Sequence, residues 1–123
     1  MGEFSHIDGV RVEVDDVVYM PSLHTPPDKP YPFIYFITIY NESDKVIKIL
    51  GRKWLVNENG GACTVVEGSG VIGETPTLKK GENFSYNSYH VVARTGEAAG
   101  ALYGLADGER FMVEIPEFAL ICP

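Results

Sequence analysis

Apolar and polar residues alternate along most of this chain, over short stretches that turn residues interrupt about every eight to twelve positions. The first stretch, Val10–Val14, alternates valine with charged residues, which is the period of a half-buried β-strand. Val17–Tyr19 continues this pattern, and a β-bulge at Asp15-Asp16 would join both parts into one strand. No stretch combines a helical period with capping residues. The chain is therefore expected to consist of β-strands and turns.

The strongest strand signal is Phe33–Tyr40, in which both alternating sets of side chains are apolar or aromatic. Two apolar faces predict a central strand with neighbours above and below. The preceding segment, Met20–Pro32, is rich in proline, which cannot donate to a strand ladder. We therefore expect an irregular connection there.

Further strands are expected downstream, each bounded by turn residues such as Asn59-Gly60 and Asp107-Gly108. The expected ranges are Val46–Val56, Cys63–Glu67, Phe84–Val92, Gly100–Leu105, Phe111–Ile115 (ended by Pro116) and Phe118–Ile121. Roughly seven or eight strands with this spacing predict an all-β, two-sheet antiparallel sandwich of the fibronectin type III or immunoglobulin kind. The 123 residues are expected to form a single domain, with a core from about Val10 to Leu120.

The charge balance narrows the choice of partners. The chain has 17 acidic and 10 basic residues, a formal net charge of −7. This argues against a broad basic footprint on nucleic acid or anionic lipid, but it is compatible with a small anion pocket. The longest apolar stretch, Tyr31–Tyr40, is too short to cross a membrane as a helix, and without a secretory segment a cytoplasmic location is expected. Cys63 and Cys122 are expected to be reduced, partly buried thiols.

Gly68, Gly70 and Gly73 have the G-x-G-x-x-G spacing of a dinucleotide-binding turn. That turn requires a following helix, whose N-terminus faces the phosphates, and an acidic residue about twenty positions later. Pro76 and Gly81 leave no room for the helix, and no carboxylate follows at the required distance. We therefore expect no nucleotide cofactor, and we expect the glycines to provide bulges or positive φ angles in the sandwich.

Several motifs recur together along the chain: Arg52-Lys53-Trp54, Asn59-Gly60, Val66–Gly73, Pro76, Lys80-Gly81-Glu82, Phe84–Ser88 and Phe111–Leu120. This combination resembles the ApaG family, whose pattern reads R-x-W, N-G, V-x-G-x-G-V-V-G, a proline and often P-G-E. The resemblance extends from about Val10 to Leu120. It departs at Tyr89, where the family commonly has glycine, and in Thr95–Tyr103, which lacks the proline and methionine of T-P-x-G-x-M-x-G-x-Y.

The resemblance implies a fibronectin-type-III-like sandwich and a stand-alone bacterial protein associated with cobalt and magnesium efflux or tolerance. Related domains occur in an F-box protein and in polymerase delta-interacting protein 2, where contact with other proteins is the suspected role. No agreed enzymatic activity comes with the family.

Metal binding and catalysis have weak support in the sequence. His6, His24 and His90 are scattered and show no ligand spacing, so no metal site is expected. Ser69 lies directly between two glycines and misses the G-x-S-x-G pattern of a nucleophile elbow. Without a visible nucleophile and base, we expect no catalytic residues and no enzyme.

Trp54 is expected to be a core anchor of the sandwich. Arg52 lies two residues earlier and points to the same face of the strand, where its charge needs a partner or a route to water. A structural salt bridge is one expected use of Arg52. An anion contact, with Gly68, Ser69, Gly70 and Gly73 supplying backbone donors, is the other.

The leading functional hypothesis is a non-catalytic module that binds an unidentified protein through sheet edges and aromatic strands. Homo-oligomers through sheet edges are compatible with the same hypothesis. Some tyrosines are expected to line a surface groove, since their hydroxyls cannot all be buried and paired: Tyr31, Tyr35, Tyr40, Tyr86, Tyr89 and Tyr103. The alternative is a sensor that binds a phosphate-like anion or divalent metal through Arg52 and the glycine loop.

Overall fold

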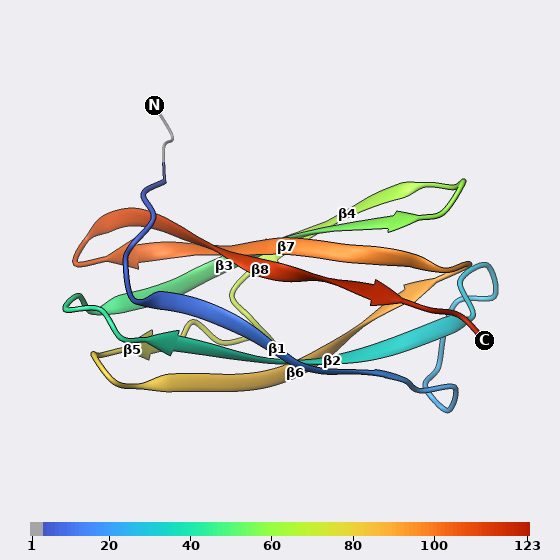
Figure 1. Cartoon of the computed structure of the whole chain (residues 1–123), viewed down its shortest axis with the longest axis horizontal. Coiled ribbons are helices and arrows are strands. Elements are labelled where there is room, and N and C mark those ends of the chain that lie inside the picture. Colours follow the sequence, from blue (N-terminus) through green and yellow to red (C-terminus); the bar gives the residue numbers. More distant parts are fainter. Residues whose placement is uncertain (1–3) are drawn as a thin grey trace.

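The computed structural model describes residues 4–123, which form eight β-strands and no helix (Figure 1). The strands are β1 (Val10–Tyr19), β2 (Tyr31–Asn41), β3 (Ile47–Glu58), β4 (Cys63–Ser69), β5 (Thr77–Leu78), β6 (Asn83–Val92), β7 (Gly96–Ala106) and β8 (Glu109–Leu120). In this range no helix is long and apolar enough to cross a membrane.

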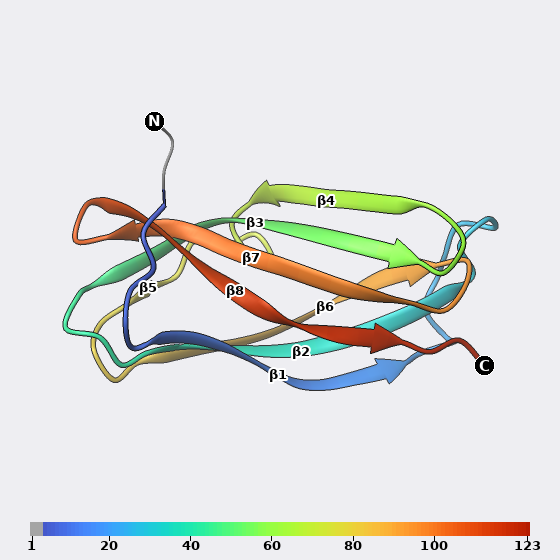
Figure 2. The ribbon, with the colours of Figure 1, turned by 45° about the horizontal axis from the view of Figure 1, so that its top comes forward.

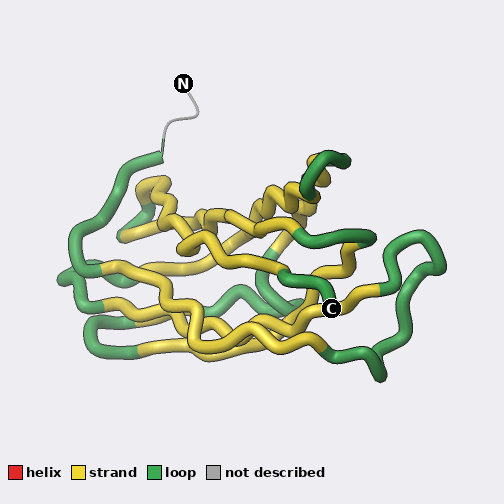
Figure 3. Tube along the Cα trace, turned by 45° about the vertical axis from the view of Figure 1, so that its right-hand side comes forward, coloured by secondary structure: helices red, strands yellow, loops and turns green. Residues whose placement is uncertain are grey.

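The strands form two antiparallel sheets that pack face to face, which confirms the predicted sandwich (Figures 1 and 3). One sheet has the order β1-β2-β6, and the other has the order β4-β3-β7-β8, with β5 paired to β3 (Figure 2). Buried side chains from both sheets form one hydrophobic core.

Strand β2 is the central strand of its sheet, as its composition predicted. Phe33, Tyr35, Ile37 and Ile39 all point into the core. The strand starts earlier than expected, because Tyr31 and Pro32 already pair with the end of β6. Proline is tolerated there because it lies at the start of the strand.

Bulges interrupt three strands. The expected bulge in β1 lies at Asp15, between Val14 and Asp16. In β8, Pro116 and Glu117 together face Ala99, so the predicted strand end at Pro116 is wrong. A residue in a bulge need not donate a hydrogen bond to the neighbouring strand, so the missing N–H of the proline is tolerated there. The strand therefore continues to Leu120.

The third bulge was not expected and decides the orientation of β3. Ile49 pairs with Gly104 and Gly51 pairs with Tyr103, so Leu50 is an extra residue. Because side chains alternate along a strand, one extra residue reverses which positions face the core. As a result Arg52 and Trp54 share the inner face with Ile49.

Two further expectations need correction. Strand β7 begins at Gly96, not at Gly100, because the small residues of this segment let it pack closely against the main chain of Asn57 in β3. Both cysteines are free, but Cys63 is exposed, and only Cys122 is partly buried. Strand β4 lies at the edge of its sheet, and this explains the exposure of Cys63.

Candidate functional site

Arg52 and Trp54 lie on the inner face of β3, next to the edge strand β4. In the ladder Arg52 is opposite Gly68, and Trp54 is opposite Val66. Trp54 is 1% exposed and is the largest fully buried side chain among residues 4–123. Val66 faces the same side but is 37% exposed, so no strand of the other sheet covers the inner face of β4. No strand closes the side between the edges of β4 and β6, which only the connection from β4 to β5 crosses within residues 4–123 (Figure 1). We call it the open side of the sandwich.

The guanidinium of Arg52 binds main-chain carbonyls. Its Nη1 donates hydrogen bonds to the carbonyl oxygens of Ser69 (3.0 Å) and Gly70 (3.1 Å). Within residues 4–123 no carboxylate lies at ion-pair distance from Arg52, so the structural salt bridge is replaced by these contacts. The structure therefore brings together Arg52 and the Gly68–Gly70 part of the glycine loop.

The rest of the glycine loop is a tight turn. Val71 and Glu74 exchange two main-chain hydrogen bonds of 2.8 and 2.9 Å around Ile72 and Gly73. Ile72 (φ 45°) and Gly73 (φ 79°) both have positive φ, as a type I′ turn requires. Gly70 also has positive φ (64°), whereas Gly68 does not. The prediction that the glycines provide bulges or positive φ angles is therefore confirmed for Gly70 and Gly73 and wrong for Gly68.

This turn does not present a nest of free N–H groups. The N–H of Gly70 donates to the carbonyl of Leu50 at 2.6 Å, and the N–H of Val71 donates to Glu74. Val71 is fully buried, whereas Ile72 is 50% exposed. The loop thus fixes Val71 in the core, and at least these two backbone donors are already used.

A cluster of aromatic rings surrounds Trp54 in the core. The Trp54 ring lies 4.8 Å from Tyr35 and 4.7 Å from His90, and Tyr35 stacks on His90 at 4.8 Å. Phe118 closes the cluster from β8, 5.7 Å from Trp54. Burial lowers the pKa of His90 to about 4, so its ring is neutral at pH 7.

Three buried polar atoms in and near this cluster have no well-aligned hydrogen-bond partner within residues 4–123: Trp54 Nε1, Tyr86 Oη and His90 Nε2. Burial raises the pKa of Tyr86, and the neighbouring Tyr35 raises it further, while the charge of Arg52 acts against this rise. Burial likewise raises the pKa of Tyr35, while hydrogen bonding from the side chain of Ser88, the charge of Arg52 and a weaker contact with the Trp54 indole act against this rise. Arg52 is thus close enough to act electrostatically on both phenols. Buried polar groups are normally paired, so three unpaired ones in one region mark it as a candidate site.

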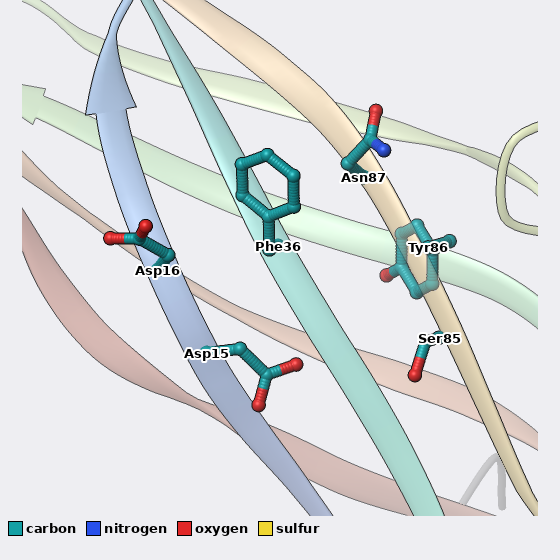
Figure 4. A pocket seen from close by; sticks show the side chains of 6 residues that line it. All are labelled: Asp15, Asp16, Phe36, Ser85, Tyr86 and Asn87. Carbon is teal, nitrogen blue, oxygen red and sulfur yellow. The ribbon is translucent and has the colours of Figure 1, made fainter.

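A shallow cavity of about 350 Å³ lies on the outer face of the three-stranded sheet. Figure 4 shows its lining: Asp15, Asp16, Phe36, Ser85, Tyr86 and Asn87. Thr38 Oγ1 donates to Asp15 at 2.6 Å and lies 2.8 Å from the Ser85 hydroxyl, so part of the polar lining is already paired. The acidic rim alone specifies no ligand.

A second, larger groove of about 650 Å³ crosses the outer face of the five-stranded sheet. Its floor is the small-residue run Ala99–Ala101 of β7, with Leu55 on one side and Met112 and Pro116 on the other. Its lining is mainly apolar and offers contact area without a fixed set of polar groups.

The remaining candidate residues are dispersed. His6 and His24 are exposed and far in sequence from buried His90. The described residues contain no group of three or more His, Cys, Asp or Glu side chains arranged for a metal ion. Of the six tyrosines considered for a surface groove, Tyr89 is 50% exposed, while Tyr35 and Tyr86 are buried.

The residues of this candidate site lie in a part of the chain that matches a known protein family. The family model described as the ApaG domain matches residues 21–104, which include Arg52, Trp54, the glycine loop and Tyr86. The chain belongs to the ApaG family. Relatives named Protein ApaG from Nitrosomonas europaea and Enterobacter sp. (strain 638) are 38% and 37% identical. These alignments cover 93% and 95% of this chain and 91% and 96% of the relatives.

Solved structures share the fold of this ApaG-family chain. An X-ray structure of a structural genomics target has a TM-score of 0.84 and 33% identity, over 94% of this chain and 89% of the other. A crystal structure described as an ApaA protein of Bordetella pertussis has a TM-score of 0.82 and 28% identity, over 98% of each chain.

Reasoning from the sequence did not place Tyr35 and Tyr86 near Arg52, nor His90 against Trp54. A signal was present, because the R-x-W and Y-x-S elements of the ApaG resemblance are Arg52–Trp54 and Tyr86–Ser88. The register between the two sheets, which brings these elements together, cannot be obtained from either motif alone.

Proposed function

We propose that this chain is a non-catalytic binding module that recognises another protein by adding a strand of the partner to β6. The supporting observation is the composition of β6, whose ten residues, Asn83–Val92, contain no Asp, Glu, Lys, Arg or Pro. The strand pairs with β2 without any shift in register. Within residues 83–92, no main-chain hydrogen bond reaches a partner outside the sheet ladder.

The other sheet edges carry features that discourage pairing. Strand β1 has a bulge at its two aspartates, and β8 has Pro116 in a bulge and pairs with Ser5 near its start. Strand β4 is shorter and contains Glu67. Charges, bulges and proline are the means by which proteins protect exposed edges. Strand β6 has none of them, which makes it the best edge for strand addition.

Two further observations fit a binding role. Tyr89 on β6 is 50% exposed, and an amphipathic ring at an edge is a common contact residue. Within residues 4–123 no nucleophile is hydrogen-bonded to Nε2 of the buried His90. We expect the module to act in the cytoplasm and to serve cobalt or magnesium tolerance, the role associated with its family, through its protein partner.

The test is affinity capture of the full chain from its native cells, with matched charge variants on two edges. Asn87→Lys/Tyr89→Lys places charges on exposed positions of β6, and Val65→Lys places one on an exposed position of β4. We expect a stoichiometric partner to be lost from the β6 variant and retained by the β4 variant. Slower amide exchange in β6 of the complex would support strand addition. Loss of the partner in the β4 variant alone would overturn the proposal.

A small-ligand sensor is the second candidate, and it is favoured because no carboxylate of the described residues pairs with Arg52. The N–H groups of Gly70 and Val71 are used within the loop, so a ligand would depend mainly on side chains. No arranged set of metal ligands supports the divalent-metal form of this candidate within the described residues.

A further inference from the structure

Arg52 is a half-buried cation that forms no ion pair within residues 4–123. Among residues 4–123, the cations in ion pairs are Arg11, Lys29 and Lys80. The only hydrogen bonds of the Arg52 side chain run from Nη1 to two carbonyl oxygens, which leaves Nε and Nη2 without a partner in this range. Carbonyl groups satisfy N–H bonds but do not neutralise a charge, and a charge removed from water favours an ionic partner.

Two groups near Arg52 are donors without a well-aligned acceptor in the part of the chain that the structure describes. The indole N–H of Trp54 can only donate, and its neighbouring acceptor, the Tyr35 hydroxyl, does not form a well-aligned hydrogen bond with it. Trp54 is 1% exposed. Tyr86 is 6% exposed, and its hydroxyl is also unpaired. Because burial raises the pKa of Tyr35 and of Tyr86, both phenols keep their protons at neutral pH and can donate.

The complement of a guanidinium and several unused donors is a negatively charged acceptor. We propose that Arg52, Trp54 and Tyr86 form a binding site for a carboxylate group, which enters from the open side beneath β4. Arg52 supplies the charge through its unpaired Nε and Nη2 atoms, and the indole and phenol supply neutral hydrogen bonds. Because Gly68 has no side chain, the guanidinium of Arg52 can lie directly over it, against β4.

A carboxylate fits better than phosphate for a reason of charge. The site holds one positive charge, and a carboxylate brings one negative charge. A phosphate dianion would leave a buried excess charge, which is costly without a second cation. The planar fork of arginine also matches the two oxygens of a carboxylate. This site goes beyond the proposed function and does not use the β6 edge, so either proposal can fail alone.

The single tryptophan of the chain provides a direct probe, because its indole N–H gives one resonance in a proton–nitrogen correlation spectrum. Sodium acetate is titrated against sodium chloride at constant ionic strength, with phosphate in a parallel series. We expect a saturable downfield shift of the indole resonance with acetate. Half-saturation is expected in roughly the millimolar range, since so small a ligand has few atoms to contribute.

Variants locate the site. Arg52→Gln should abolish the saturable shift, and Tyr86→Phe should weaken acetate binding by about tenfold. Arg110→Gln removes the same charge from an exposed position on β8 and should leave the titration unchanged. If Arg52→Gln unfolds, Arg52→Lys replaces it, because it retains the charge without the fork and should bind acetate more weakly.

A linear shift that chloride reproduces, or an equal shift in a folded Arg52 variant, would show an adventitious ion only and would overturn the proposal. Tighter saturation by phosphate would overturn the choice of carboxylate. A short peptide with a free carboxyl terminus and its amide form distinguish the source of the group. If the acid form of the peptide binds more tightly than acetate, the natural ligand is a peptide carboxylate. If it binds equally or more weakly, the natural ligand is a free small acid. Either result supports the site.

Discussion

The guanidinium of Arg52 lies over Gly68, with Nη1 and Nη2 at 3.0 and 3.1 Å from the position that a β-carbon on Gly68 would occupy. The two residues face each other across the β3–β4 ladder. Gly68 has no positive φ, so backbone conformation does not explain glycine here. Its role is to leave room for the arginine that binds the carbonyls of Ser69 and Gly70.

Gly68→Ala should therefore lower stability through Arg52. The added methyl group displaces the guanidinium by a few tenths of an ångström and weakens its two carbonyl hydrogen bonds, at a cost of about 1 kcal/mol. Urea unfolding of Gly68→Ala, Arg52→Ala and the double variant measures the coupling, which should be about 1 kcal/mol. Strictly additive losses would contradict this relationship.

Gly70→Ala should be more damaging than Gly73→Ala. Both positions have positive φ, which costs a residue with a β-carbon about 1–2 kcal/mol. At Gly70 the new carbon also collides with the carbonyl oxygen of Glu74, whereas at Gly73 it meets open space. We expect Gly70→Ala to lose at least about 1 kcal/mol more than its matched control in denaturant unfolding, without a change in slope. Equal losses would show that the collision relaxes at no cost.

Ile72→Asn should stabilise the protein. Ile72 has a φ of 45°, which is unfavourable for a β-branched residue, and its side chain is 50% exposed. Asparagine followed by Gly73 is a preferred type I′ pair. We expect a gain of about 1 kcal/mol, measured as a higher midpoint of unfolding. Ile72→Ala serves as the control, because it shortens the side chain but gains less in the left-handed region. A lower midpoint for Ile72→Asn would mean that contacts of the isoleucine outweigh its strain.

Acid should destabilise the protein through His90. Its pKa is lowered to about 4 by burial, whereas in the unfolded chain it has the ordinary value of 6.5. Above pH 6.5 both states are neutral, and as the pH falls towards 4 only the unfolded state gains the proton. The stability that depends on neutral His90 is therefore lost across this window, up to about 3 kcal/mol.

His90→Phe retains an aromatic ring and removes the titration. The difference in unfolding free energy between wild type and this variant should change between pH 6.5 and 4, and it should be flat above pH 7. His24→Gln, at an exposed position, is the control for general loss of a histidine. Parallel pH profiles for wild type and His90→Phe would contradict the assignment.

Local features of the fold could be predicted from the sequence because they depend on neighbouring residues. The period of Val10–Val14, the aspartates of the β1 bulge and the strand signal of Phe33–Tyr40 each predicted what the structure contains. A neighbour on the outer face of β2 was also expected, but Ile34 and Phe36 on that face stay partly exposed. Asp107-Gly108 forms a turn in which both residues have positive φ. The Asn59-Gly60 hairpin exists as well, but only Gly60 has positive φ, because the connection is longer than a two-residue turn.

The sequence by itself therefore determined the strands, most of the turns and the family, since periodicity and turn chemistry act over a few residues. The tertiary structure decided the extra residue at Leu50, which turns Arg52 and Trp54 inward, and the continuation of β8 through Pro116. It also decided that Tyr86 would stand unpaired near Arg52 and that β6 would form an open edge. The physical reason is that hydrogen-bond partners, counter-charges and strand neighbours come from segments far apart in the chain, and only packing brings them together.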